Sequence, residues 1–181
     1  GQAQPAFLHR RTYMALSFYT VDKAYIDYLQ SAELQARGFT HVPNMEYNNR
    51  EQKFTCGIVL RIKDLNYYVP VFSYTKQQKD NILINISQDI KNPVKGSLRF
   101  NYMFPAPDSS ITQLIISREE VKCRNLLNKE LRFIQANETR IRNKAKQTYS
   151  KVINKVNENI LKNSCDFSLL EHACKKYKSA C

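Results

Sequence analysis

Several kinds of residue and segment are scarce in this chain of 181 residues. It has only 4 glycines and 6 prolines, while 43% of its residues are hydrophobic, so we expect a folded rather than a disordered chain. No stretch approaches the roughly 20 apolar residues that span a bilayer, and residues 1–13 lack the apolar segment of about 7–15 residues that a secretory signal carries. These absences argue against a membrane or secreted protein and predict a cytoplasmic one.

Residues that bind metals or build disulfide frameworks are also few. The five cysteines and 3 histidines are widely separated and include no Cys-x-x-Cys pair, which argues against a zinc site. Acidic residues such as Glu46, Glu51 and Asp64 form none of the clusters that a Mg²⁺-dependent nuclease needs. We therefore predict no metal and no cofactor. Cys56 lies within an apolar run and is expected to be a small buried side chain.

Positive charge is what the chain has in excess. The net charge of +12 divides unevenly, with +8 in residues 118–181 and +4 in residues 1–117. Such a basic region attracts phosphate backbones, although a solvated lysine-rich helix face is an equal alternative. Five basic residues of the C-terminal part are the first candidates for RNA contact: Arg118, Lys122, Arg140, Lys144 and Lys151.

The length suits one domain with a substantial core. We expect this domain to occupy residues 14–181 and to follow a leader or tag at residues 1–13, because Met14 would serve as a natural start. Alternating or continuous apolar residues predict strands over 16–20, 53–62, 67–72, 81–87 and 97–104, with 111–116 as an edge strand or the entry to the next helix.

Helical periodicity appears mainly in the C-terminal third. Thr20 is a candidate cap for the one early helix, and Ser117 with Glu120 fits a capping box. The predicted helices cover residues 21–36, a segment beginning at 117, residues 138–161 and a segment beginning at 166. The predicted fold class is α+β, an antiparallel sheet with helices collected mainly at the C-terminal end.

The segments 47–53 and 67–76 carry the groups that metal-free RNA cleavage needs. Such cleavage requires a base for the 2′-hydroxyl, an acid for the leaving 5′-oxygen, positive charge at the phosphorus and in-line geometry. Tyrosine, lysine and hydroxyl side chains can supply these groups, and a lysine can act as the base where burial or neighbouring cations lower its pKa.

Five ordered motifs give the chain a specific resemblance. From Leu16 to Tyr177 it is similar to the endoribonuclease toxins of type III toxin–antitoxin systems, the ToxN/AbiQ/CptN family. The matching residues are Ser17-Phe18-Tyr19-Thr20 with Tyr25-Ile26-Asp27-Tyr28-Leu29; Val42-Pro43-Asn44; Gly57-Ile58-Val59-Leu60-Arg61-Ile62 with Tyr68-Val69-Pro70-Val71 and Ser73; Glu130-Leu131-Arg132-Phe133-Ile134-Gln135-Ala136-Asn137; and Cys165-Asp166-Phe167-Ser168-Leu169-Leu170-Glu171.

The resemblance implies a sheet-and-helix fold similar to the MazF/Kid toxins. It also implies metal-independent cleavage of cellular or phage RNA, usually at A-rich sites, to 2′,3′-cyclic phosphate and 5′-hydroxyl ends. The implied partner is an inhibitory RNA pseudoknot, the antitoxin, in a ring of alternating protein and RNA. Abortive infection against phage is the implied biology.

The same resemblance implies the site residues. Lys53 and Ser73 match the family's active-site lysine and serine, and Tyr47 is the nearest match to its loop tyrosine, with a longer spacing. After Ser73 the family lysine is replaced by Thr75, and Lys76 follows one step further. Ser73 would position the 2′-hydroxyl or a phosphate oxygen, Lys53 would be base or charge stabiliser, and Lys76 with Tyr47 would contact phosphate or protonate the leaving oxygen.

Two other functions remain open at this point. Tyrosines between lysines, Tyr47, Tyr67 and Tyr74, could stack unpaired bases in a non-catalytic RNA-binding protein. Alternatively, the basic helices could dock on an acidic partner protein. Cleavage of A-rich RNA in EDTA separates the nuclease from the first alternative, and survival of the complex under RNase treatment would favour the second.

Overall fold

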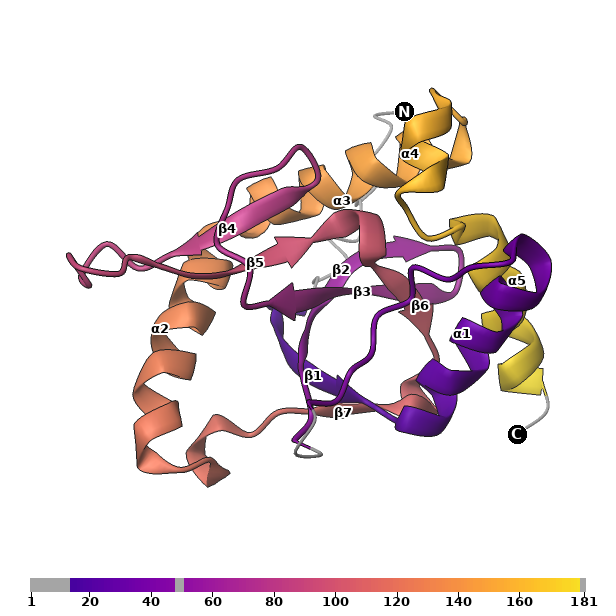
Figure 1. The fold of residues 1–181 in the computed structure, drawn as a ribbon. Helices are drawn as coiled ribbons and strands as arrows, with labels where there is room; N and C mark the ends of the chain where they lie inside the picture. The colour runs from indigo at the N-terminus through magenta and orange to yellow at the C-terminus, as the bar shows by residue number, and fades with distance from the viewer. Residues whose placement is uncertain (1–13, 48–50, 180–181) are drawn as a thin grey trace, which may run out of the picture.

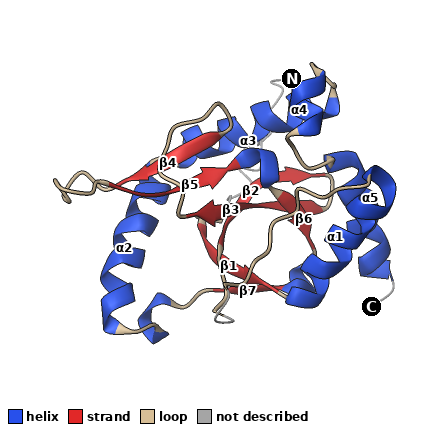
Figure 2. Ribbon diagram, viewed as in Figure 1, coloured by secondary structure: helices blue, strands red, loops and turns tan. Residues whose placement is uncertain are grey.

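The computed structural model describes residues 14–47 and 51–179. The predicted leader at residues 1–13 lies outside this described part. Within it, an antiparallel sheet of seven strands forms the centre of the molecule and helices surround it (Figure 2), so the predicted α+β class is confirmed. The strands are β1 (Ser17–Val21), β2 (Thr55–Ile62), β3 (Leu65–Phe72), β4 (Asn81–Asn85), β5 (Val94–Arg99), β6 (Phe104–Ala106) and β7 (Ile111–Gln113).

The sheet order is β4-β5-β3-β2-β1-β7, and β6 pairs with β3 beside β5. The β2–β3 hairpin is the longest pairing, and β1 extends the sheet from β2 to β7. The segment after residue 111 therefore begins as an edge strand, which is one of the two predicted alternatives. Gly57 in β2 fits closely against β3, because a Cβ atom there would lie 2.4 Å from a ring carbon of Tyr68.

The strand predicted over residues 97–104 is divided in the structure. β5 pairs with the end of β3, where Phe72 lies opposite Ser97, whereas β6 pairs with its beginning, where Tyr68 lies opposite Phe104. The 3-10 helix η1 (Phe100–Tyr102) takes up the extra residues between these two pairings. The prediction of one continuous strand was wrong because alternation of apolar residues continues through the turn.

Five helices complete the described part: α1 (Lys23–Arg37), α2 (Val121–Ala136), α3 (Glu138–Ile153), α4 (Glu158–Lys162) and α5 (Phe167–Ser179). Helices α1 and α5 lie side by side at one end of the sheet, and α2 lies at the opposite end (Figure 1). Helix α3 packs against β2, and α5 packs against β6. Across the described residues, no helix is both long enough and apolar enough to cross a bilayer.

Three details of the predicted helices were wrong. Thr20 pairs with Thr112 inside the sheet, and α1 begins only after Asp22. Ser117 belongs to a short 3-10 helix, so α2 begins at Val121 without a side-chain cap. The helix predicted over 138–161 ends at Ile153, because Lys155 adopts a left-handed conformation with φ of 49° and Asn157 then caps α4.

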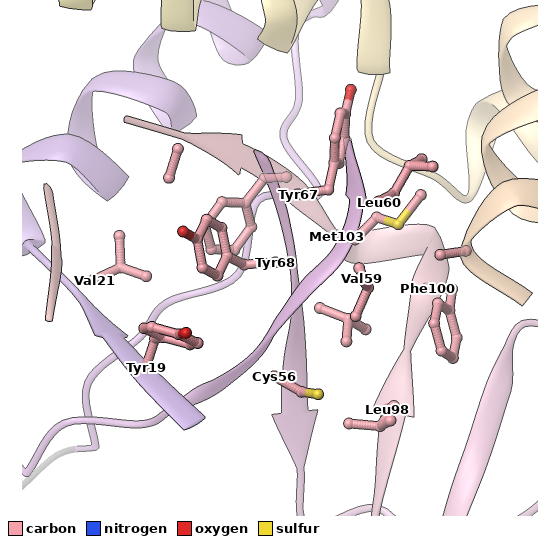
Figure 3. Close-up of a cluster of buried hydrophobic side chains, with 14 of the residues drawn as sticks. Tyr19, Val21, Cys56, Val59, Leu60, Tyr67, Tyr68, Leu98, Phe100 and Met103 are labelled. Carbon is pink, nitrogen blue, oxygen red and sulfur yellow. The ribbon is translucent and has the colours of Figure 1, made fainter. Parts of the chain in front are cut away.

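The core fills the space between the sheet and its helices (Figure 3). Tyr67, Tyr68 and Phe100 are among its largest buried side chains, and each such ring contributes about 2–3 kcal/mol when removed from water. Cys56 is completely buried, which confirms its predicted place. Because Tyr67 is also completely buried, the prediction that its ring could stack on RNA bases was wrong.

Candidate active site

Ser73 follows the last residue of β3, between two neighbouring segments. On one side the carbonyl of Phe54 accepts a hydrogen bond from the Val71 N–H at 3.2 Å, which brings Lys53 beside the end of β3. On the other side β5 approaches so closely that a Cβ on Gly96 would lie 2.4 Å from the Phe72 carbonyl oxygen. Only glycine fits this approach, so Gly96 helps to fix the backbone that carries Ser73.

Tyr47 reaches the same region through a small hairpin. The N–H of Lys53 donates to the carbonyl of Met45 at 2.9 Å, and the N–H of Tyr47 donates to the carbonyl of Glu51 at 2.7 Å. This pairing folds the chain back, so the Lys53 Nζ lies 5.0 Å from the centre of the Tyr47 ring. Two residues that are six positions apart in sequence therefore form one tyrosine–lysine pair.

A cavity of about 600 Å³ lies between the sheet and α2, and both Tyr47 and Ser73 line it. In Figure 1 the arrowhead of β3 points towards the side on which α2 lies. The wall is of mixed charge, because Lys95 from β5 and Glu130 from α2 also line it. The structure thus places the predicted Tyr47 and Ser73 at one cavity, to which Lys53 is linked through its contact with the Tyr47 ring, and it adds Lys95 and Glu130, which sequence reasoning missed.

Lys95 places a second cation beside Ser73. It lies one residue before Gly96, on the strand that pairs with the end of β3. Its ammonium group forms an ion pair with Asp89, and its side chain is 19% exposed. Nothing in the local sequence distinguishes this lysine from other surface lysines, because its importance comes from the pairing of β5 with β3.

Glu130 contributes a buried carboxyl group to the cavity. The residue is 6% exposed, no hydrogen bond joins its carboxyl group to another described residue, and its oxygens are not among the fully buried polar atoms that lack a partner. Burial raises the pKa of Glu130 to about 7, against the opposing effect of Lys95. A carboxyl group with a pKa near neutrality can both give and take a proton at physiological pH, which suits it to acid–base chemistry.

Thr75 and Lys76 lie just beyond this cluster. Both are exposed in the loop that joins β3 to β4, and neither lines the cavity. Asn81 holds this loop, since its Nδ2 donates to the Lys76 carbonyl at 2.9 Å and its Oδ1 accepts from the Gln78 N–H at 2.8 Å. The participation of Thr75 and Lys76 therefore remains a prediction.

The five basic residues predicted to bind RNA fall on different parts of the surface. Arg140 and Lys144 line a second hollow of about 670 Å³, on the α3 side of the β3–β4 loop. Arg118 and Lys122 flank Glu119 and Glu120, which line the cavity that contains Ser73. Lys151 lines neither hollow. Their contact with RNA also remains a prediction.

Groups of three or more His, Cys, Asp or Glu side chains arranged to hold a metal ion do not occur among residues 14–47 and 51–179. Three of the cysteines, Cys56, Cys165 and Cys174, are buried, and Cys123 is exposed on α2. The polar groups of the candidate site are therefore hydroxyl, amine and carboxyl groups.

The fold is shared with solved toxins of bacterial type III toxin–antitoxin systems. One, studied for its selective inhibition by a non-coding RNA pseudoknot, superimposes with a TM-score of 0.78 at 24% identity, over 91% of this chain and 98% of its own. Another is AbiQ, a lactococcal anti-phage endoribonuclease of a type III system, with a TM-score of 0.75 at 29% identity, over 91% and 99% of the two chains.

Sequence comparison gives the family. Residues 17–175 match the family model described as toxin ToxN of type III toxin–antitoxin systems, and the chain belongs to this family. Endoribonuclease AbiQ of Lactococcus lactis subsp. lactis is 31% identical over 169 residues, which are 87% of each chain. Endoribonuclease ToxN of Bacillus thuringiensis subsp. kurstaki is 27% identical over 172 residues, which are 89% of this chain and 84% of that protein.

Proposed function

We propose that this protein is the endoribonuclease toxin of a type III toxin–antitoxin system and that an RNA pseudoknot antitoxin inhibits it. The observation that carries the proposal is that Tyr47 and Ser73 line one cavity and that Lys53 contacts the Tyr47 ring, in a chain of the ToxN family. The named relatives at 31% and 27% identity are endoribonucleases, which supports the same activity here. The net charge of +12 favours association with RNA.

The proposed reaction is attack of a ribose 2′-hydroxyl on the adjacent phosphorus without a metal ion. The 2′-oxygen forms a bond to phosphorus, the bond to the 5′-oxygen breaks, and the products carry a 2′,3′-cyclic phosphate and a 5′-hydroxyl. The proton lost by the 2′-hydroxyl goes to a basic group, and the 5′-oxygen receives a proton from an acidic group. No net water is consumed in this step.

Five side chains take roles in this proposal. Ser73 hydrogen-bonds the 2′-hydroxyl or a phosphate oxygen and so sets the attack geometry. Lys53 acts as the base or stabilises charge on the phosphorane, and its contact with the Tyr47 ring fixes its position. Tyr47 and Lys76 bind phosphate or protonate the 5′-oxygen, while Thr75 positions the RNA.

The partners follow from this activity. The substrate is cellular or phage RNA, which places the protein in the cytoplasm. The antitoxin pseudoknot binds over the same site and closes with the toxin into a ring-like assembly of protein and RNA. Release of the toxin during phage infection then causes abortive infection.

The Ser73→Ala substitution tests the proposed site. We expect it to lower cleavage of A-rich RNA in EDTA by at least about 100-fold, because the group that positions the reacting oxygen is lost. The unfolding midpoint should stay unchanged, since Ser73 is exposed. End analysis of the RNA products should show cyclic phosphates with the parent protein.

Ser87→Ala, at an exposed serine after β4, is the matched control and should cleave like the parent. Full activity of Ser73→Ala would reject the proposed role of Ser73. If the purified parent binds RNA but leaves it intact, the protein is instead a non-catalytic RNA-binding protein.

A further inference from the structure

A continuous row of aromatic rings and cations begins next to Ser73. Tyr74 is the first ring, and the guanidinium of Arg99 lies 5.6 Å from its centre. The same guanidinium lies 4.6 Å from the centre of the Tyr102 ring and 5.7 Å from that of Phe72. Arg99 therefore links the loop after β3 to η1 through ring faces.

The row continues from Tyr102 across two further rings. His41 is stacked on Tyr102, with centroids 5.6 Å apart and planes at 17°. Phe39 meets His41 edge-on at 5.3 Å, and the guanidinium of Arg37 lies 4.4 Å from the Phe39 ring centre. We call these residues the aromatic row: Tyr74, Tyr102, His41 and Phe39, with the cations Arg99 and Arg37.

The row is accessible and its members are held in place. Tyr74 and Phe39 are 38% and 39% exposed, and the members between them are partly exposed. His41 is fixed by Nε2, which lies 2.5 Å from the carbonyl oxygen of Lys162 and donates to it. Rings that are accessible and already held in one orientation suit the stacking of nucleic-acid bases, because such a ring loses little conformational entropy when a ligand binds.

The two arginines differ in a way that indicates a ligand. Arg37 donates to the carbonyl oxygens of Leu161 and Ser164 and to the carboxylate of Glu33, so its hydrogen-bonding groups are used within the protein. Arg99 has no such hydrogen bond or ion pair with any residue that the structure describes, and its Nε is buried without a partner. Buried polar groups without partners are uncommon, and a guanidinium held only by ring faces retains its N–H groups for an anion.

We propose that the aromatic row is a binding track for single-stranded RNA that leads away from the cleavage site. Arg99 binds a backbone phosphate, and the exposed rings at the two ends of the row, Tyr74 and Phe39, stack on unpaired bases. Tyr102 and His41 hold the row together, because the Tyr102 ring is already covered by Arg99 and by His41. The inference rests on the proposed function, because the track begins one residue after Ser73. Paired bases have their faces covered by neighbouring bases, so duplex RNA does not fit the track.

Length-dependent binding tests the track directly. The probes are fluorescein-labelled single-stranded RNAs of mixed sequence, of about 4 and about 16 nucleotides, bound to the Ser73→Ala protein to prevent cleavage. We expect Phe39→Ala, at the far end of the row, to weaken binding of the longer RNA by about 5- to 150-fold, which corresponds to the loss of one stacked base. The shorter RNA should lose less, so the affinity gained with length should shrink. Arg99→Gln should lower the salt dependence by about one phosphate contact.

Two variants separate stacking from structural effects. Phe39→Tyr keeps an aromatic ring and should restore the affinity for the longer RNA, whereas Phe39→Leu fills similar space without a π face and should not. Tyr177→Ala, at an aromatic residue on α5 outside the row, is the control and should bind like the Ser73→Ala parent. Thermal unfolding of each variant verifies its fold, and Phe39→Leu replaces the alanine variant if the latter unfolds.

Two results would overturn the track. One is unchanged affinity for the longer RNA in both Phe39→Leu and Tyr74→Leu, and the other is equal competition by duplex RNA. Failure of the proposed function gives a different result, because RNA incubated with the unmutated protein would then remain uncut whatever the row variants show.

Discussion

Two buried glutamates sit in contrasting environments. Glu33 on α1 is completely buried and accepts hydrogen bonds from Arg37, the Thr40 hydroxyl and the N–H groups of His41 and Asp166, at 2.6 to 3.1 Å. Its carboxylate therefore joins α1, the following loop and the start of α5. Such a network offsets the cost of burying a charge.

Glu130 has almost the same burial but none of these hydrogen bonds among the described residues. Its carboxyl group faces the cavity with Ser73, and its pKa is raised to about 7 by burial. Burial without protein donors disfavours the ionised carboxylate, whereas donors such as those around Glu33 offset that cost. The comparison teaches that the charged form of Glu33 is accommodated by the fold, whereas the charged form of Glu130 is expected to destabilise it.

The largest expected effect comes from Glu33→Gln. This substitution places an amide NH₂ against groups that are themselves donors and removes the carboxylate that pairs with Arg37, so we expect a loss of about 3–5 kcal/mol in the free energy of unfolding. Denaturant unfolding at pH 7 measures it. A loss below about 1 kcal/mol would show that the Glu33 network contributes little and would remove the contrast with Glu130.

The same substitution at Glu130 should act in the opposite direction. The pKa of this carboxyl group rises from 4.5 in the unfolded chain to about 7 in the fold, so the folded state binds more protons between these values. Stability contributed by the protonated form is complete below pH 4.5 and is lost as the pH rises through 7. At pH 8, Glu130→Gln should therefore stabilise the protein by about 3 kcal/mol relative to the parent.

Unfolding curves at pH 5 and pH 8 test this expectation. The gain from Glu130→Gln should be small at pH 5, where the parent carboxyl group is protonated, and large at pH 8. Glu33→Gln should remain destabilising at both. A Glu130→Gln protein that is less stable than the parent at pH 8 would show that Glu130 has favourable partners and would contradict the comparison.

Local sequence patterns were sufficient for much of the fold. Alternation located the β2–β3 hairpin and the buried Cys56, because one face of each strand packs against the core. It failed over residues 97–104 and 138–161, where a 3-10 turn and a left-handed residue interrupt apolar spacing that continues. Such breaks depend on tertiary packing, which local spacing does not encode.

The residues of the candidate site also divide into those that local sequence motifs predict and those that they do not. Tyr47, Lys53 and Ser73 could be found because they belong to recognisable motifs close to strand ends. Lys95 and Glu130 could not, since each becomes part of the cavity only through the packing of β5 and α2 around the end of β3. A lysine on an edge segment and a glutamate on an amphipathic helix are otherwise ordinary surface residues.

Glu171 on α5 is intermediate between Glu33 and Glu130 in the number of donors around its carboxylate. A substitution beside it gives the smallest expected change in stability. Its Oε2 accepts hydrogen bonds from the hydroxyls of Tyr67 and Tyr149, at 2.6 and 2.8 Å. Tyr149→Phe removes one donor and leaves the other, so the loss in the free energy of unfolding should be about 1 kcal/mol, well below that of Glu33→Gln.

Tyr177→Phe is the control, because the Tyr177 hydroxyl makes no hydrogen bond within the described part of the chain and its removal should change stability little. Equal losses for Tyr149→Phe and Glu33→Gln would mean that stability does not follow the number of donors around a carboxylate, and the contrast between Glu33 and Glu130 would then lose its basis.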